Sequence, residues 1–98
     1  MVNVLIRHTV ADFPRWKQVF DGHLSLRKAG GELGFRMFHN HANPVDLILI
    51  CEWETLDKAK AFFASDTLRK GMAEAGVASA PEVTYLDEIR AFHRTAAD

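Results

Sequence analysis

Hydrophobic and polar positions alternate along residues 2–10, which predicts a β-strand. One face of this strand carries Val2, Val4, Ile6, His8 and Val10. After Asp12 the spacing changes to steps of three and four, which predicts a helix with Asp12 as its N-cap. One stripe of that helix consists of Phe13, Trp16, Phe20, Leu24 and Arg27. Gly30 and Gly31 are expected to end it.

The middle of the chain has the pattern of a β-hairpin. Residues 32–40 predict a strand in which Gly34 permits a β-bulge and one face of which holds Phe35, Met37 and His39. Residues 41–46 have the composition of a turn. Residues 47–53 predict the partner strand, which is apolar on both faces over its first five residues.

Two further helical segments are expected after the hairpin. Thr55 can cap the first of them, whose apolar stripe consists of Leu56, Ala59, Phe62 and Phe63. The second begins at Ser65 or Asp66 and ends at Gly76. Its inward positions are Leu68, Met72 and Ala75.

A last strand is expected from Glu82 to about Ile89 or Phe92. The element order is then β-α-β-β-α-β, which predicts an α+β fold of the ferredoxin-like class with a four-stranded antiparallel sheet. Both helical crossovers should cover the same face of that sheet. We expect residues 1–93 to form a single domain and residues 94–98 a flexible tail.

The other face of this sheet would be bare in a single chain. It would expose Leu5 together with the second apolar face of residues 47–53. A large uncovered apolar sheet is unstable in water, and a second copy of the same face is its simplest cover. The pattern therefore predicts a homodimer.

Composition narrows the classes of partner and compartment. The 98 residues carry 12 basic and 13 acidic side chains, and this balance argues against binding to nucleic acid or to an anionic membrane. A single cysteine excludes an internal disulfide, and no apolar run approaches the ~20 residues of a membrane span. The charge at Arg7 comes too early for a secretion signal. We expect a soluble cytoplasmic protein.

His8 is the first candidate for chemistry. It shares a strand face with Val4 and Ile6, and a neutral imidazole in such a place can act as a general base. The alternative is a histidine that is only hydrogen-bonded in the core or in a dimer interface. His23 and His93 have the pattern of surface residues.

A second pair of histidines stands near the hairpin turn. His39 and His41 would point to one side if the strand continued, and Asp46 could complete a divalent metal site. Neither an HxxxH nor a CxxC motif supports such a site. We expect His39 to line a pocket without a metal.

Large aromatic side chains are expected in the layer between helices and sheet: Trp16, Phe20, Trp53, Phe62 and Phe63. They can form a close-packed core or the wall of a pocket for a planar ligand. We expect Trp16, Phe20 and Trp53 to contact a ligand. The two tryptophans are the better candidates, because a large indole often leaves its N–H edge near a cavity.

Several polar residues have an ordinary and a functional interpretation. Glu52 can be a partly buried acid or base, or an ion-pair partner of Arg7 or Arg36, and these arginines could also bind an anionic substrate. Tyr85 could donate a hydrogen bond to a ligand, whereas Cys51 is expected to be inert packing. The sequence has neither a GxGxxG motif nor a P-loop, so we expect no nucleotide cofactor.

Three segments resemble the dimeric α/β-barrel superfamily that includes the antibiotic biosynthesis monooxygenases. They are residues 12–21, residues 34–38 and residues 52–62, which begin with Asp-Phe-Pro-Arg-Trp, Gly-Phe-Arg-Met-Phe and Glu-Trp-Glu-Thr-Leu. The pattern from Ser65 to Val83 is similar to a small subfamily of uncharacterised bacterial proteins within it. The resemblance spans about residues 3–92.

This resemblance implies a pocket between helices and sheet and oxidation without a cofactor, driven by an electron-rich substrate ring. Some relatives degrade haem with an Asn and a Trp, for which Asn3 and Trp53 are the matching residues here. Those relatives also use a helix-borne histidine as iron ligand, and the helices expected after Trp53 contain none. This departure from the pattern of the haem-degrading relatives argues against haem chemistry.

Two functions follow from the sequence, and a third depends on geometry. The first is a cofactor-independent monooxygenase-type enzyme for a small planar or phenolic compound, with His8 as its base. The second is a non-catalytic dimer that binds a small ligand or takes part in a stress response. The third is proton-transfer chemistry, isomerase or lyase, which needs His8 and a carboxylate such as Glu52 in one cavity.

Overall fold

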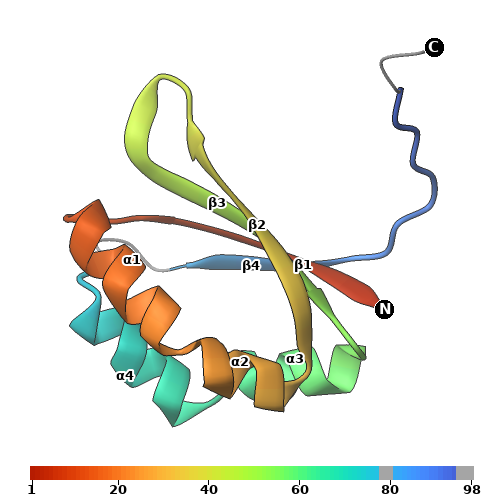
Figure 1. Cartoon of the computed structure of the whole chain (residues 1–98), viewed down its shortest axis with the longest axis horizontal. Helices are drawn as coiled ribbons and strands as arrows, with labels where there is room; N and C mark the ends of the chain where they lie inside the picture. The colour runs from red at the N-terminus through yellow and green to blue at the C-terminus, as the bar shows by residue number, and fades with distance from the viewer. Residues whose placement is uncertain (78–80, 95–98) are drawn as a thin grey trace.

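The computed structural model describes residues 1–77 and 81–94, and it confirms the β-α-β-β-α-β order with each helical crossover divided into two helices (Figure 1). The elements are β1 (Val2–Thr9), α1 (Phe13–Gly22), α2 (Leu24–Gly30), β2 (Glu32–Asn40), β3 (Asn43–Trp53), α3 (Leu56–Phe63), α4 (Asp66–Glu74) and β4 (Glu82–Leu86). Within the described residues, no helix is long and apolar enough to cross a membrane.

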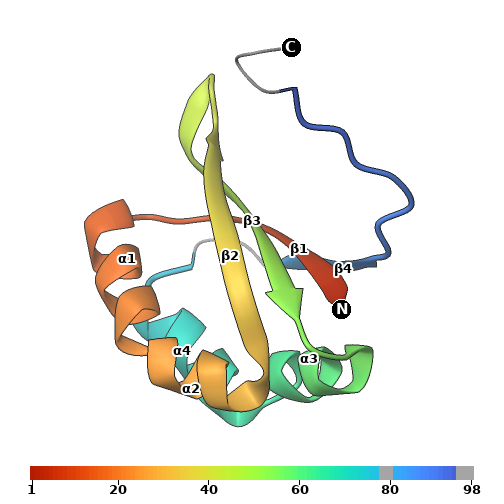
Figure 2. The same ribbon diagram turned by 45° about the vertical axis from the view of Figure 1, so that its right-hand side comes forward.

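The four strands form one antiparallel sheet in the order β2-β3-β1-β4. All four helices lie on one face of it, and the tip of the β2–β3 hairpin extends beyond them (Figures 1 and 2). This arrangement confirms the ferredoxin-like α+β fold. The opposite face has no helical cover in the single chain.

The predicted caps define most helix ends. Asp12, Thr55 and Ser65 are the N-caps of α1, α3 and α4, and their side chains accept hydrogen bonds from the backbone N–H groups of Arg15, Lys58 and Leu68. Each bond satisfies one of the donors that a helix start leaves unpaired. Gly31 and Gly76 follow α2 and α4 with φ angles of 113° and 72°, a left-handed region that favours glycine.

The first crossover is not the single helix that the stripe predicted. It breaks at His23, which closes α1 and precedes α2. The break rotates α2, so that Leu24 is 38% exposed while Arg27 is buried. The prediction of one continuous stripe through Leu24 was therefore wrong, because the steps of three and four hold only within one continuous helix.

Two strand boundaries also differ from the prediction. The hairpin turn is shorter than residues 41–46, because β3 already begins at Asn43 and the Asn40 side chain accepts a hydrogen bond from the Ala42 N–H. The strand β4 ends at Leu86, and residues 87–94 run away from the sheet (Figure 1). Of the expected tail, residues 95–98 lie outside the described residues, so the domain boundary stays a prediction.

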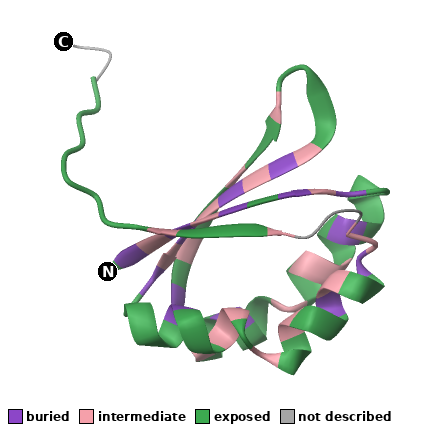
Figure 3. Cartoon of the chain, turned by 180° about the vertical axis from the view of Figure 1, so that it is seen from behind, coloured by how far each residue is buried: buried purple, intermediate pink, exposed green. Residues whose placement is uncertain are grey.

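The core lies between the helices and the central strands. Strand register aligns Val4 with Cys51, Ile6 with Leu49 and His8 with Leu47, so these side chains share the helix-facing side. Figure 3 shows buried residues along β1 and β3, and exposed residues on the outer surface of the helices. The largest fully buried side chains are Trp53, Leu47, Leu49, Val4, Val10 and Cys51.

We call the opposite side the outer face. Its apolar members come from all four strands: Leu5, Phe38, Ile48, Ile50 and Leu86. Phe38 is 40% exposed and Leu86 37% exposed, which is unusual for apolar residues in a sheet. The predicted second apolar face is therefore present.

Candidate functional site

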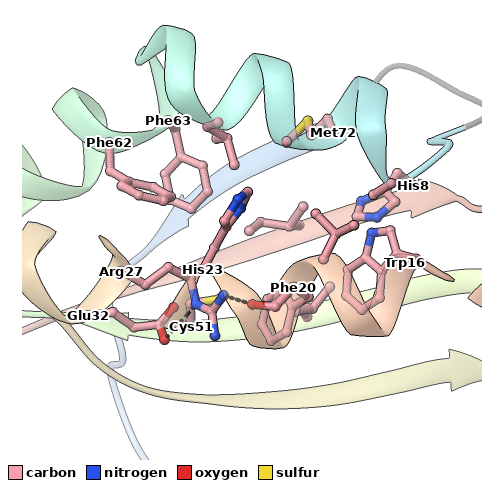
Figure 4. Close-up of a pocket in the computed structure, with 16 residues that line it drawn as sticks. His8, Trp16, Phe20, His23, Arg27, Glu32, Cys51, Phe62, Phe63 and Met72 are labelled. Atoms are coloured by element: carbon pink, nitrogen blue, oxygen red, sulfur yellow. Dashed lines mark hydrogen bonds and ion pairs between the residues drawn. The ribbon is translucent and has the colours of Figure 1, made fainter. Parts of the chain in front are cut away.

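A cavity lies between the sheet and the helices; we call it the helix–sheet cavity (Figure 4). Its volume is about 70 Å³, which at ~15 Å³ per molecule is room for about five waters. Its wall is mainly apolar and includes Ile6, Leu49, Phe62, Phe63, Leu68 and Met72. His8, His23, Arg27 and Glu32 add polar groups to it. An apolar wall with a few polar side chains is typical of a small-molecule site.

His8 lies at one end of the cavity, where β1 places it on the helix-facing side (Figure 4). It is 5% exposed, and among the described residues neither ring nitrogen has a hydrogen-bond partner. We call these atoms the open nitrogens. Burial lowers the pKa of His8, so its imidazole is neutral at neutral pH. The cavity thus contains an uncharged base with lone-pair and donor capacity unused.

Trp16 and Phe20 line the cavity beside His8, as predicted from the helical stripe. The ring centroids of Trp16 and His8 are 5.6 Å apart, and Trp16 stacks on Phe20 at 4.9 Å with an interplanar angle of 12°. The pair presents flat aromatic surface next to the base. This arrangement suits a planar ligand.

The other end of the cavity contains a buried ion pair that the sequence did not reveal. Arg27 Nε lies 3.1 Å from Glu32 Oε1, and the two side chains are 6% and 3% exposed. Burial raises the pKa of Glu32, and the nearby Arg27 guanidinium opposes part of that rise. Within the described part of the chain, Glu32 Oε2 is buried without a partner, and we call it the open oxygen.

A β-bulge places Glu32 in the cavity. The register of β2 on β3 shifts between Glu32 and Gly34, and as a result Glu32 is aligned with Trp53, on the helix-facing side. Without the shift, strict alternation from Phe35 would turn Glu32 to the outer face. Gly34 had been identified as a position that permits a bulge, but its effect on Glu32 was not foreseen.

His23 is half-buried and also lines the cavity, so the prediction of a surface residue holds only in part. Its ring packs against α4 at Gly71, where a Cβ atom would lie 2.7 Å from His23 Cε1. The same residue borders a second, open depression on the surface, together with Arg15, Gln18 and Glu74. His23 therefore separates the helix–sheet cavity from the outside.

We expect Gly71→Ala to lower the free energy of unfolding by about 1 kcal/mol, because overpacking outweighs the helix propensity gained. In a His23→Ala background the clash is gone, and the same change should raise stability by up to ~1 kcal/mol. Urea unfolding of the four proteins measures this reversal of sign. Gly22→Ala, where a Cβ meets nothing within 4 Å, is the matched control. The same sign in both backgrounds would contradict the packing of His23 on Gly71.

Two predicted pocket residues do not line the cavity. His39 is exposed near the hairpin tip, and its Nδ1 lies 2.9 Å from the Asn40 carbonyl oxygen. Trp53 is fully buried behind the wall, against Phe62 and Phe63 at 5.0 and 5.5 Å between ring centroids. Alternation along a strand does not give the depth of a residue or its position relative to the helices, and both decide whether it lines the cavity.

The structure does not bring a metal site together at the hairpin. The Asp46 carboxylate instead pairs with Arg7 at 2.8 Å and accepts a hydrogen bond from Asn40. Across residues 1–77 and 81–94, no group of three His, Cys, Asp or Glu side chains could hold a metal ion. Asn3 and Trp53, the residues matching the haem-degrading relatives, face opposite sides of the sheet.

The remaining candidates lie away from a shared site. Glu52 is aligned with Asn3 on the outer face, so it cannot act with His8, and this excludes the proton-transfer hypothesis as formulated with Glu52. Glu54 pairs with Lys58. Burial raises the pKa of the Cys51 thiol to about 12, which agrees with inert packing, although Cys51 does line the cavity.

Comparison with solved structures identifies the fold. SnoaB from Streptomyces nogalater, described as a cofactor-independent oxygenase, aligns with a TM-score of 0.77 and 14% identity, over 95% of this chain and 97% of that chain. A crystal structure named antibiotic biosynthesis monooxygenase aligns at 0.69 and 13% identity, over 92% and 100%. Rv0793 from Mycobacterium tuberculosis aligns at 0.66 and 14%, over 92% and 96%.

The sequence matches no family model and no curated protein. The structural matches nevertheless cover nearly the whole chain, and the fold of the antibiotic biosynthesis monooxygenase-like proteins is therefore shown. At these identities the likeness concerns the fold and not the reaction.

Proposed function

We propose that this chain is a small cofactor-independent monooxygenase-type enzyme that acts on a small planar or phenolic compound. The observation that carries the proposal is His8: a buried, neutral imidazole that lines the cavity beside Trp16 and Phe20 and whose ring nitrogens have no hydrogen-bond partner among the described residues. SnoaB, which has the same fold, is described as a cofactor-independent oxygenase. This supports the reaction class.

The proposed reaction needs a base and molecular oxygen. His8 takes a proton from an activated C–H of an electron-rich ring, and the resulting carbanion or phenolate passes electrons to O₂. One oxygen atom enters the product as a carbonyl and the other leaves as water, so that a CH₂ group plus O₂ gives C=O plus H₂O. The apolar wall keeps bulk water from the anion.

The test is oxygen consumption by the purified protein with anthrone-like and quinol-like compounds. We expect uptake of one O₂ per carbonyl formed, above the rate of autoxidation in buffer. If none of these compounds is turned over while some of them raise the melting temperature, the protein is a ligand-binding dimer, and the oxygenase proposal fails.

We also propose that the outer face is covered by a second copy of the chain. Leu5, Ile48 and Ile50 are only half-buried in the single chain and Phe38 is 40% exposed. Ile89 and Phe92, which follow β4, are 98% and 83% exposed. A two-fold dimer would bury the same apolar surface on both copies. Interfaces of this kind are more apolar than ordinary protein surface.

We expect the wild type to be a dimer at micromolar concentration and Ile50→Asp to weaken the dimer at least about 100-fold, since it buries a charge in the interface. Ala61→Asp, on the exposed side of α3, is the matched control and should leave the dimer intact. Sedimentation equilibrium measures the assembly state. A monomeric wild type would contradict the covering of the outer face.

A further inference from the structure

We propose that the open oxygen of Glu32 binds a hydroxyl or N–H group of the ligand, at the end of the helix–sheet cavity remote from His8. The ligand would then be a hydroxylated or amino-substituted aromatic compound whose donor group is separate from its reacting carbon. The inference rests on the proposed function only in assuming that the cavity holds a small ligand. It requires no reaction at His8.

The first argument is the unused acceptor. Only 3% of the Glu32 side chain is exposed, and its Oε2 has no partner among the described residues. Buried carboxylate oxygens are seldom left without a hydrogen bond, because removing them from water costs free energy that only a donor offsets. Because Glu32 lines the cavity, a ligand bound there can supply that donor.

The second argument is that Arg27 holds this acceptor in place. Its Nε donates to Glu32 Oε1, its Nη1 donates to the Phe20 carbonyl oxygen, and its guanidinium carbon lies 3.7 Å from the centroid of the Phe20 ring. These contacts fix both the guanidinium and the carboxylate (Figure 4). A fixed acceptor loses little entropy when a ligand binds.

The third argument concerns charge. Arg27 and Glu32 neutralise each other, so this end of the cavity carries no net charge, while its free group is an acceptor. A carboxylate oxygen excludes anions and binds O–H or N–H donors through charge-assisted hydrogen bonds. The expected ligand group is therefore neutral, such as a phenol hydroxyl or an aromatic amine.

The fourth argument is the distance from His8. Strand register places Glu32 level with Val2, six residues from His8 along β1. At ~3.3 Å per residue the two backbone positions are about 20 Å apart. One hydroxyl cannot reach both residues, so the anchoring group and the reacting group of the ligand must be different.

The probes are phenol and toluene, which differ by a hydroxyl in place of a methyl group. We expect wild-type protein to bind phenol about 10- to 100-fold more tightly, the ratio for a hydrogen bond to a charged acceptor. In Glu32→Gln the ratio should fall to a few-fold, because a neutral amide replaces the carboxylate. In His8→Leu it should persist. Quenching of Trp16 fluorescence gives each Kd.

Glu32→Gln also weakens the partner of a buried guanidinium and could fail to fold. The proposal can then be tested on the wild type alone: phenol, but not toluene, should shift the NMR signal of the Arg27 Nε–H group. Equal affinity for the two probes, or a preference that is lost in His8→Leu and kept in Glu32→Gln, would overturn the proposal. A preference for phenol without oxygen uptake would overturn the oxygenase alone, and oxygen uptake without the preference would overturn the Glu32 site alone.

Discussion

Replacing Arg27 with Met is expected to lower the free energy of unfolding by about 3–5 kcal/mol, the usual cost of removing one partner of a buried ion pair. The change leaves the Glu32 carboxylate buried beside an apolar side chain, whereas in the wild type its Oε1 accepts from Arg27 Nε at 3.1 Å. A loss of this size is a large part of the stability of a small domain. Denaturant unfolding followed by circular dichroism measures it.

The loss should grow with pH. Burial already raises the pKa of Glu32 in the wild type, and removal of the Arg27 charge raises it further. A carboxyl group with a raised pKa in the folded state stabilises the fold while protonated and loses this contribution as pH rises through that pKa. The free energy of unfolding of Arg27→Met should therefore be closest to that of the wild type near pH 4.5 and furthest below it above neutral pH.

The double variant Arg27→Met, Glu32→Leu is the matched control. It replaces both charges with apolar groups and should recover most of the lost stability, with little dependence on pH. A single variant as stable as the wild type at every pH would show that the pair is solvated. It would also remove the fixed acceptor on which the proposed donor site depends.

The sequence was sufficient for the fold because its signals are local and repeated. Alternation along β1 grouped His8 with Val4 and Ile6 on one face, and three N-cap residues positioned the starts of α1, α3 and α4. The strand register of the structure shows that this face is the helix-facing side. In this fold both crossovers cover one face of the sheet, so this side is also the side of the cavity. Trp16 and Phe20 followed from the helical stripe of α1.

The Arg27–Glu32 end of the cavity was missed because two small irregularities act together. The bulge before Gly34 turns Glu32 inward, and the break at His23 sets the direction of α2, from which Arg27 enters the cavity. Each irregularity concerns one residue. Gly34 was a visible signal for the first, and the presence of Arg27 in an otherwise apolar stripe was a signal that a buried partner exists.

Trp53 and His39 show what alternation along a strand cannot predict. Alternation assigns a side chain to a face, but it does not say how deep the residue lies or which neighbours cover it. Trp53 lies under Phe62 and Phe63, and His39 lies beyond the helices, near the hairpin tip. The position of a cavity depends on where the helices end, and that is a property of packing rather than of any one strand.

Replacing His8 with Leu is expected to reduce the rate of oxygen consumption about 10²- to 10⁴-fold, the range for loss of a general base. The substitution should not unfold the protein, because it removes two buried nitrogens that have no partner among the described residues and keeps an apolar side chain of similar size. The variant should unfold at the same temperature as the wild type or higher. Oxygen-electrode rates and calorimetry on the same samples separate the two effects.

The pH dependence of activity and of stability gives a second test of the role of His8. The pKa of His8 is lowered by burial, so the free base persists below pH 6.5 and the acid limb of the wild-type kcat/KM profile should lie below that value. Below pH 6.5, His8 binds a proton in the unfolded state but not in the folded state. The free energy of unfolding of the wild type should therefore fall as the pH drops below 6.5. His8→Leu should not show this decrease.

Trp16→Phe is the matched control for the His8 experiment, since it changes the cavity wall 5.6 Å from the imidazole and keeps the base. It should raise KM more than it lowers kcat, because it removes ring surface that binds substrate and transition state alike. If His8→Leu retains wild-type rates while Trp16→Phe does not, the cavity binds the substrate but His8 is not the base.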